Sequence, residues 1–481
     1  MLFSTPAFFV FFLVYLAFHL VVPARYRVLL IVAGSTIFYA WWKVEYTWLP
    51  YALMLTAYGG VVWMERAADS RGRKRRAAAT IVLLFVPLLV FKYTDFFYRG
   101  VIGFARDERS GGLVNLPLPL GVSFITFTLT AFVVDTYQRR FPSGQRPWTV
   151  LAYVLFFPHL IAGPILRPHE LIPQLDRPGR ARRRLAVPLA IFTIGLVKKL
   201  VFADQIADAV DTIYRLAPGQ VSAPSALLAI YGFSAQIYCD FSGYTDMAIG
   251  LALMLGVRLP NNFLRPYAAA SIVDFWRRWH ITLSYWLRDY LYIPLGGNRH
   301  GRGQEMRNVV VTMTLGGLWH GANWTFVIWG LLHGFAVACV HWFKGLFRWP
   351  RRPTNPDRDA EPHDPGRSRL PAWAGVLLTF HFVTMLWVFF RAPSVGDATR
   401  LLSAPFVASW TGAPAFLSAN VFVVALIGVF LLVHRYDDHR RIKAAVRRLR
   451  PEILWPVLGL LWIVAITVSQ GSSAKFIYFD F

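Results

Sequence analysis

Two histidines, His280 and His320, stand in stretches suited to the interior of a membrane protein, and imidazole exchanges protons readily near neutral pH. His320 lies in TLGGLWHGANWTF, at the end of an apolar run that would enter a bilayer. An ionisable side chain at that depth is costly unless it meets a cavity or a partner, so a functional role is the first hypothesis. The alternative is a structural, neutral imidazole that is hydrogen-bonded to Asn323 or to a backbone carbonyl.

His280 belongs to the stretch DFWRRWHITLSYWLRDYLYIPLGGNR, residues 274–299. Helical spacing predicts one amphipathic helix in which His280 adjoins a polar row made of Asp274, Arg277, Ser284 and Arg288. The opposite side carries Ile272, Trp276, Trp279, Leu283, Trp286 and Tyr290. Such a helix lies along a bilayer surface or seals the mouth of a cavity.

Further polar side chains interrupt apolar sequence. Asp240 and Asp246 in YCDFSGYTDMAIG need partners if they lie in a membrane. They could orient a catalytic histidine or pair with an arginine of the 277–288 region, and a purely structural ion pair is the favoured interpretation. His159 in FFPHLIAGP could line a channel or be structural.

The composition indicates the elements that must position these side chains. Of 481 residues, 56% are hydrophobic and 16% charged, which is unusual for a soluble globular protein. Apolar runs, several near the ~20 residues that a spanning helix needs, recur at 3–22, 27–42, 47–63, 78–92, 117–134, 187–202, 224–238, 308–318, 324–343, 372–390, 418–433 and 453–469. We therefore expect an all-α, polytopic membrane protein that forms a single domain over residues 1–481.

The net charge of +24 is concentrated in blocks between the apolar runs. The positive-inside rule predicts that these blocks are cytoplasmic and that both termini are extracytoplasmic; the blocks are residues 24–27, 71–76, 138–140, 177–184, 351–353 and 439–450. Residues 150–166 then lie between two cytoplasmic blocks, which predicts a re-entrant segment. This arrangement accounts for the basic charge better than nucleic-acid binding does.

The N-terminus, one polar loop and the two cysteines restrict the function less than the histidine stretches do. We expect the first apolar run to be retained rather than removed as a signal peptide. Residues 351–369 are predicted to form a mobile cytoplasmic loop. Cys239 and Cys339 show no spacing typical of a metal or disulfide site, and no metal is expected. The predicted extracytoplasmic segments, 95–115, 203–222 and 392–417, are short.

The two histidine stretches, together with PLGVSFITFT, FFPHLIAGPILRP, DFSGYTDMAIGLALMLGVRLPNNFLRPY and the final FIYFDF, resemble the membrane-bound O-acyltransferase family. They are most similar to its bacterial branch typified by the alginate O-acetyltransferase membrane subunit. The tail departs from that branch at Asp480, where glutamine is common. The resemblance implies about eleven membrane helices, plus re-entrant segments, around a channel whose funnels meet near His320.

The resemblance also implies roles for the site residues. His320 would be the general base for acyl transfer to a hydroxyl, and His280 would bind substrate or act as a second acid or base. Candidate donors to the oxyanion are the side chains of Asn323, Trp319 and Trp324 and the backbone amides near Gly321. The arginines, Arg277, Arg278 and Arg288, could meet donor phosphates or lipid headgroups.

The function expected from the resemblance is transfer of an acetyl group from cytoplasmic acetyl-CoA toward hydroxyls of an extracytoplasmic polysaccharide, in a bacterial inner membrane. No permanently bound cofactor is expected, and an extracytoplasmic acetyltransferase-like protein is the expected partner. The aromatic tail would be a docking element or part of an interfacial belt. Two alternatives remain open: D-alanyl or other acyl transfer to teichoic acid or peptidoglycan, and a transporter or channel with a histidine-lined path. The absence of a GxSxG motif gives no support to a serine hydrolase.

Overall fold

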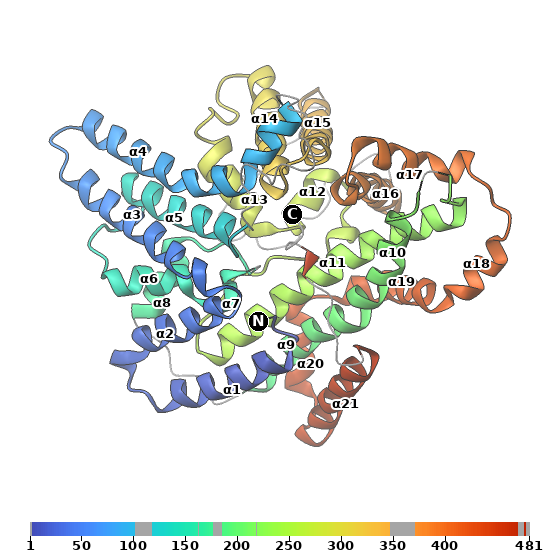
Figure 1. The fold of residues 1–481 in the computed structure, drawn as a ribbon, viewed down its shortest axis with the longest axis horizontal. Helices are drawn as coiled ribbons and strands as arrows, with labels where there is room; N and C mark the ends of the chain where they lie inside the picture. Colours follow the sequence, from blue (N-terminus) through green and yellow to red (C-terminus); the bar gives the residue numbers. More distant parts are fainter. Residues whose placement is uncertain are drawn as a thin grey trace, which may run out of the picture. The chain divides into compact units, whose positions relative to one another are not determined.

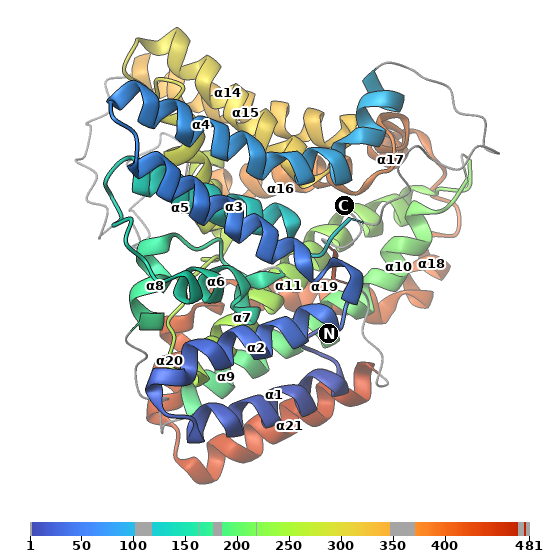
Figure 2. The same cartoon turned by 60° about the vertical axis from the view of Figure 1, so that its left-hand side comes forward.

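The computed structural model describes residues 2–101, 118–161, 163–176, 185–217, 219–346, 371–469 and 476–477. Within these ranges all regular structure is helical and no strand occurs, so the all-α prediction is confirmed (Figures 1 and 2). A helix satisfies its backbone hydrogen bonds internally, which explains why a chain this apolar adopts it. The basic block 177–184, the loop 351–369 and the tail residues 478–481 lie outside the described ranges.

The contacts divide the chain into two units. The first comprises Met1–Ala207, Gln236–Asn261 and His439–Phe481, and the second comprises Asp208–Ala235 and Asn262–Asp438. Helices α10 (Asp204–Tyr214) and α11 (Ala223–Met254) contribute residues to both units.

The first unit contains α1 (Pro6–Val21), α2 (Arg27–Ala40), α3 (Trp48–Glu65), α4 (Ser70–Leu88), α5 (Val122–Tyr137), α6 (Pro147–Leu155), α7 (Phe157–Leu160), α8 (Pro168–Asp176), α9 (Ala186–Val197), α20 (His439–Arg448) and α21 (Pro451–Ser469). Its short 3-10 turns are Ala24–Tyr26 and Val44–Tyr46, and its π-helical turns are Leu89–Tyr93, Phe96–Val101 and Lys198–Ala203.

The second unit contains α12 (Ile272–Arg278), α13 (Ile281–Leu287), α14 (Arg302–His320), α15 (Trp324–Leu346), α16 (Ala372–Arg391), α17 (Val395–Val407), α18 (Ala413–Ala419) and α19 (Val421–Val433). Its short 3-10 turns are Pro266–Ala268 and His434–Tyr436, and its π-helical turn is Arg288–Tyr292.

Five helices within the described residues are long and apolar enough to cross a membrane. They are Ser70–Tyr93, Ala186–Tyr214, Trp324–Phe343, Ala372–Arg391 and Pro451–Ser469. A bent pair, α18 with α19 and the turn that follows it, would make a sixth span. The helix Ala186–Tyr214 continues into the predicted extracytoplasmic segment 203–222, and its 29 residues exceed the ~20 that a crossing needs. The count of about eleven spans stays a prediction.

The segment predicted to be re-entrant forms two short helices, α6 and α7, separated at Phe156. α6 has nine residues, and at 1.5 Å per residue its length is about 14 Å, under half of a ~30 Å hydrocarbon core. Tyr153 is buried, and its hydroxyl oxygen lies 2.8 Å from the Leu166 carbonyl oxygen and 3.2 Å from that of Thr128. The segment is therefore too short to span and is enclosed by protein, as a re-entrant segment must be.

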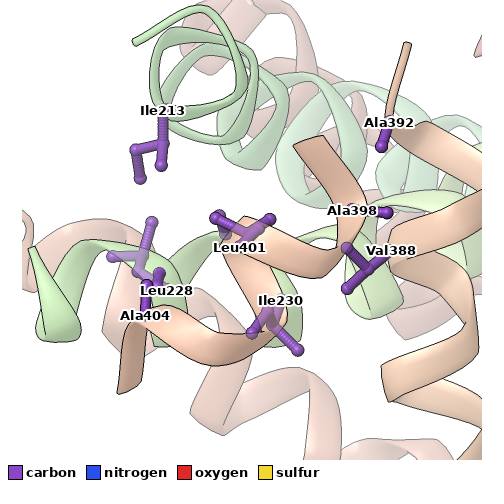
Figure 3. Packing of buried hydrophobic residues seen from close by; sticks show 10 residues of the cluster. Ile213, Leu228, Ile230, Val388, Ala392, Ala398, Leu401 and Ala404 are labelled. Atoms are coloured by element: carbon purple, nitrogen blue, oxygen red, sulfur yellow. The ribbon is translucent and has the colours of Figure 1, made fainter. Parts of the chain in front are cut away.

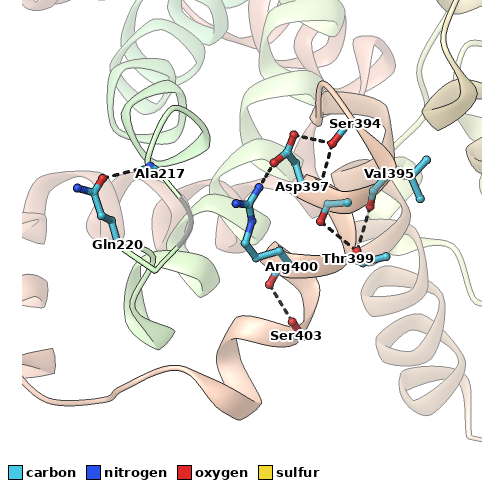
Figure 4. Close-up of polar contacts among 9 residues, drawn as sticks. Ala217, Gln220, Ser394, Val395, Asp397, Thr399, Arg400 and Ser403 are labelled. Atoms are coloured by element: carbon cyan, nitrogen blue, oxygen red, sulfur yellow. Dashed lines mark hydrogen bonds and ion pairs between the residues drawn. The ribbon is translucent and has the colours of Figure 1, made fainter. Parts of the chain in front are cut away.

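The predicted extracytoplasmic segment 392–417 contains a packed amphipathic helix, α17. Ser394 caps it, because the Ser394 hydroxyl accepts the Asp397 backbone N–H at 3.1 Å. Arg400 pairs with Asp397 on the same face (Figure 4). Ala398, Leu401 and Ala404 of α17 pack into a buried apolar cluster with Ile213, Leu228, Ile230, Val388 and Ala392 (Figure 3). Alternating polar and apolar residues at helical spacing thus hold this segment against α11 and α16.

Candidate active site

Two antiparallel helices, α14 and α15, place His320 (Figures 1 and 2). Their backbones approach closely because glycines face each other. A methyl group on Gly317 would lie 2.3 Å from the carbonyl oxygen of Phe326, and one on Gly330 would lie 2.4 Å from that of Met313. This close contact at Gly317 and Gly330 determines where α14 ends relative to α15.

His320 is the last residue of α14, since the following Gly321 has an extended backbone. The imidazole is only 3% exposed. Its ring centroid lies 4.9 Å from that of Trp319, 5.4 Å from Trp329 and 5.2 Å from Phe390. The carbonyl end of a helix stabilises positive charge. The site therefore encloses His320 in aromatic rings at the carbonyl end of a helix, where a protonated imidazole would be stabilised.

The prediction of one continuous helix around His280 is wrong, because the helix is interrupted between α12 and α13; we call this interruption, at Trp279 and His280, the break. Trp279 is extended, and His280 has a φ of 42°, in the left-handed region that non-glycine residues rarely adopt. Ser284 lies one turn into α13, where its hydroxyl oxygen is 3.4 Å from the Trp279 carbonyl oxygen and its N–H donates to the His280 carbonyl. The break therefore orients the His280 side chain differently from a residue in a continuous helix.

Asn262 holds this break together. Its backbone carbonyl accepts the N–H of Ile281 at 3.0 Å. Its side-chain oxygen lies 3.2 Å from His280 Nδ1, 3.2 Å from the Thr282 nitrogen and 3.0 Å from the Thr282 hydroxyl. Sequence reasoning missed Asn262, which the structure buries; the signal available was an amide side chain in RLPNNFLRPY, directly after the apolar stretch GLALMLGV.

The break brings His280 and His320 together. Their ring centroids are 6.5 Å apart, and Trp319 lies 6.5 Å from His280 as well. An oxygen atom hydrogen-bonded to both rings fits this separation, since each such bond is about 2.8 Å long. Burial lowers the pKa of His280 to about 3, so its imidazole is neutral near pH 7.

The candidate oxyanion donors differ in their surroundings. The Asn323 side chain is occupied, because its nitrogen donates to the Pro393 carbonyl at 2.9 Å and its oxygen accepts the Thr325 N–H. Trp324 is 48% exposed. Trp319 is buried and its ring lies beside both imidazoles. Trp319 therefore lies in the immediate surroundings of the histidine pair.

The three predicted arginines also differ. Arg277 is exposed on α12. Arg278 pairs with Asp274 at 2.9 Å, and Arg288 with Asp289 at 2.7 Å. Arg277 is therefore the best placed of the three for a phosphate or a lipid headgroup.

Asp240 lies in the first unit and has a lysine partner there. Lys199 contacts Asp240 at 2.8 Å and Asp204 at 2.8 Å. The other Asp240 oxygen accepts the backbone N–H of Ile477 at 2.7 Å. Phe476 and Ile477, the described part of the aromatic tail, are buried, so these two residues are anchored within the first unit and do not form an exposed docking surface.

Asp246 is likewise satisfied within the first unit. Lys198 donates to it at 2.7 Å, and His439 Nε2 lies 2.7 Å from its other oxygen. The suggested arginine partner was wrong for both aspartates, because adjacent lysines of a π-helical turn supply the positive charge. These contacts agree with the favoured interpretation of structural ion pairs.

His159, also in the first unit, is buried in α7 and its Nε2 lies 2.9 Å from the Tyr153 carbonyl. This bond satisfies one ring nitrogen as a structural histidine would. His159 thus helps to hold the turn between α6 and α7.

Sequence reasoning also missed His333 on α15. It is fully buried, and its Nδ1 accepts the indole N–H of Trp276 at 3.3 Å. Its ring centroid lies 4.8 Å from that of Trp329, one helical turn earlier. The spacing of Trp329 and His333 by four residues was the available signal.

Within the described ranges, no group of three or more histidine, cysteine, aspartate or glutamate side chains could hold a metal ion.

Comparison with known proteins reveals similarity over most of the chain. Residues 144–358, which include both histidines, match the membrane-bound O-acyltransferase family. The chain is 37% identical to the probable alginate O-acetylase of Azotobacter vinelandii, with 85% of this chain and 79% of the relative covered. It is 36% identical to the peptidoglycan O-acetyltransferase of Helicobacter pylori, over 77% and 72%. A teichoic acid D-alanyltransferase of Bacillus subtilis is 26% identical over 56% and 67%.

Proposed function

Because this chain belongs to the membrane-bound O-acyltransferase family, we propose that it transfers an acetyl group from acetyl-CoA to hydroxyl groups of an extracytoplasmic polysaccharide. It is a multi-pass membrane acyltransferase, so the alternative of a transporter or channel is set aside. The observation that carries the proposal is the proximity of His280 and His320 inside the region that matches the family.

The histidine pair suggests how the transfer proceeds. The hydroxyl oxygen attacks the thioester carbonyl carbon while His320 removes the hydroxyl proton. The carbonyl oxygen becomes an oxyanion, which an N–H donor such as the Trp319 indole stabilises. The oxyanion then collapses, the carbon–sulfur bond breaks, and the protonated His320 returns its proton to the departing thiolate. An ester and free CoA thiol result, and His320 is regenerated.

The proposed donor side is cytoplasmic. The exposed Arg277 precedes the His280 break by three residues, where it can pair with a phosphate of CoA. The basic block 71–76 and helix α20 support this orientation, because such clusters remain on the cytoplasmic side of membranes.

Cysteine labelling tests the orientation. In a variant lacking Cys239 and Cys339, a membrane-impermeant reagent applied from outside should label a cysteine introduced at Thr411 and should not label one at Arg75. Both positions are exposed in the structure. The reverse pattern would overturn the proposed orientation and move the donor to the other side.

The acyl group and the acceptor are tested together with the purified protein. The protein should release free thiol from acetyl-CoA and, with an extracytoplasmic acetyltransferase added, label a polysaccharide such as alginate or peptidoglycan, which are the acceptors named for two of the relatives. Transfer solely from a D-alanyl carrier protein would replace acetyl-CoA with the donor type of the teichoic acid relative.

We further propose an extracytoplasmic acceptor protein, because the donor and the polymer lie on opposite sides of the membrane. Liposomes with acetyl-CoA inside and polysaccharide outside provide the test. Acetylation of the polymer should be slow until an extracytoplasmic acetyltransferase is added. Efficient acetylation by the chain alone would show that no partner is needed.

A further inference from the structure

One contact, with the backbone N–H of Thr282, determines how the side-chain amide of Asn262 is oriented. Its Oδ1 lies 3.2 Å from the backbone nitrogen of Thr282. A backbone N–H can only donate, so the amide atom that faces it must be the acceptor oxygen and not the amide nitrogen. The Thr282 hydroxyl, 3.0 Å from the same oxygen, is a second donor.

This orientation determines which nitrogen of His280 carries the proton. His280 Nδ1 lies 3.2 Å from the same Asn262 oxygen. Because an amide oxygen has no proton to give, Nδ1 must donate. A neutral imidazole carries one ring proton, so Nε2 then has a lone pair and acts as an acceptor.

Asn262 also controls the backbone of the break. Its carbonyl accepts the N–H of Ile281, so the single residue Asn262 contacts three consecutive residues, 280–282. His280 is the middle of the break and has the left-handed φ of 42°. A strained residue persists where its surroundings over-determine it, and these contacts do so here.

We propose that Asn262 is a positioning residue that holds His280 in its Nδ1–H tautomer, so that Nε2 accepts a hydrogen bond from the attacking hydroxyl. The role of the hydroxyl rests on the proposed function, whereas the tautomer does not. His280 then orients the nucleophile and His320 removes its proton. A neutral Nε2 acceptor cannot stabilise an oxyanion, which leaves that task to an N–H donor such as Trp319. The low pKa of His280 agrees with this division.

The tautomer can be measured directly by NMR of protein in nanodiscs with 15N-labelled histidine rings. The chain has 12 histidines, so the His280 signals are assigned as those lost in His280→Gln. The wild-type protein should show a protonated Nδ1 and an unprotonated Nε2 at this position. A protonated Nε2 would overturn the proposal whether or not the protein transfers acetyl groups.

Steady-state kinetics test the positioning role. Asn262→Leu removes the acceptor and should lower kcat roughly 100-fold with little change in the KM for acetyl-CoA. Asn262→Asp keeps acceptor oxygens and should recover kcat to within about tenfold of the wild type. An Asn262→Leu protein with wild-type kcat, or an Asn262→Asp protein as slow as Asn262→Leu, would overturn the proposal.

The neighbouring Asn261 provides a matched control. Its side chain contacts His439 at 2.8 Å. Asn261→Leu makes the same change one residue earlier and should retain kcat within about threefold, a difference typical of small packing changes. An equal loss in both leucine variants would assign the effect to packing and overturn the positioning role. If Asn262→Leu does not fold, the comparison of Asn262→Asp with the wild type and the NMR measurement still decide.

If the wild-type protein shows no acyl transfer with any donor, the proposed function fails, and the NMR result alone decides the tautomer.

Discussion

His320→Gln tests whether the imidazole is a base or only a packing element. Loss of a general base lowers kcat about 10²- to 10⁴-fold, which is about 3–5 kcal/mol in the activation barrier. The ring also contacts Trp319, Trp329 and Phe390. At about 0.5–1.5 kcal/mol for each of these three aromatic contacts, up to about 4.5 kcal/mol of stability is at risk, and glutamine recovers part of it by filling similar space.

His333→Gln is the matched control, because His333 is as deeply buried and contacts a comparable aromatic set. Its ring centroid lies 4.8 Å from Trp329 and 5.1 Å from Trp276, from which it also accepts a hydrogen bond. The two variants should therefore lose similar stability, whereas only His320→Gln should lose the catalytic step.

Two measurements on protein purified in detergent separate these effects: the thermal unfolding midpoint and kcat for thiol release from acetyl-CoA. We expect comparable midpoints, a kcat at least about 100-fold lower for His320→Gln, and near wild-type kcat for His333→Gln. Equal kcat losses in the two variants, or wild-type turnover by His320→Gln, would refute the general-base role.

Three further outcomes are expected. Gly330→Leu should prevent α14 and α15 from packing, because even a methyl group there would lie 2.4 Å from the Met313 carbonyl oxygen; monodisperse, active protein would contradict this. Lys199→Met should destabilise the protein by about 3–5 kcal/mol, since it leaves Asp240 buried without its cation; an unchanged unfolding midpoint in detergent would contradict it. His280, with its pKa lowered from 6.5 to about 3, contributes stability that is complete above pH 6.5 and is lost as the pH falls toward 3, at up to about 1.4 kcal/mol per pH unit. The unfolding midpoint of His280→Gln should therefore fall less between pH 7 and pH 4 than that of the wild type, and parallel curves would count against a neutral, buried imidazole.

The sequence predicted the all-α class, because helix formation in a membrane chain depends on local properties. Apolar runs of helical length leave a membrane chain little choice of backbone structure. Glycines near His320 allow two helix backbones to meet, and the structure shows this at Gly317 and Gly330.

The break at His280 could not be predicted from the same kind of pattern. Residues 272–290 have helical spacing of polar and apolar side chains, and such spacing does not detect one interrupted turn. The interruption depends on Asn262, which is 18 residues earlier in the chain. A competing hydrogen-bond partner from a distant segment overrides local helix propensity.

Charge pairing was equally nonlocal. The sequence showed that Asp240 and Asp246 needed partners, because a buried carboxylate is costly. It did not show that Lys199, 41 residues before Asp240, and Lys198, 48 residues before Asp246, would supply them. Any basic side chain satisfies the charge requirement, so the choice between lysine and arginine depended on which one the packing of the π-helical turn brought within reach.

By itself, the sequence determined that this chain is a helical membrane protein, and its motifs pointed to His280 and His320. Both conclusions need only the residue types and their order, and not which distant segments contact each other. Only the tertiary structure decided that these two imidazoles lie 6.5 Å apart, that Asn262 orients one of them, and that the tail at Phe476 is buried in the first unit. Each of these relations joins segments far apart in the chain. The distances between these segments depend on how the helices pack and on which of several competing hydrogen bonds form. The order of residue types along the sequence does not contain that information.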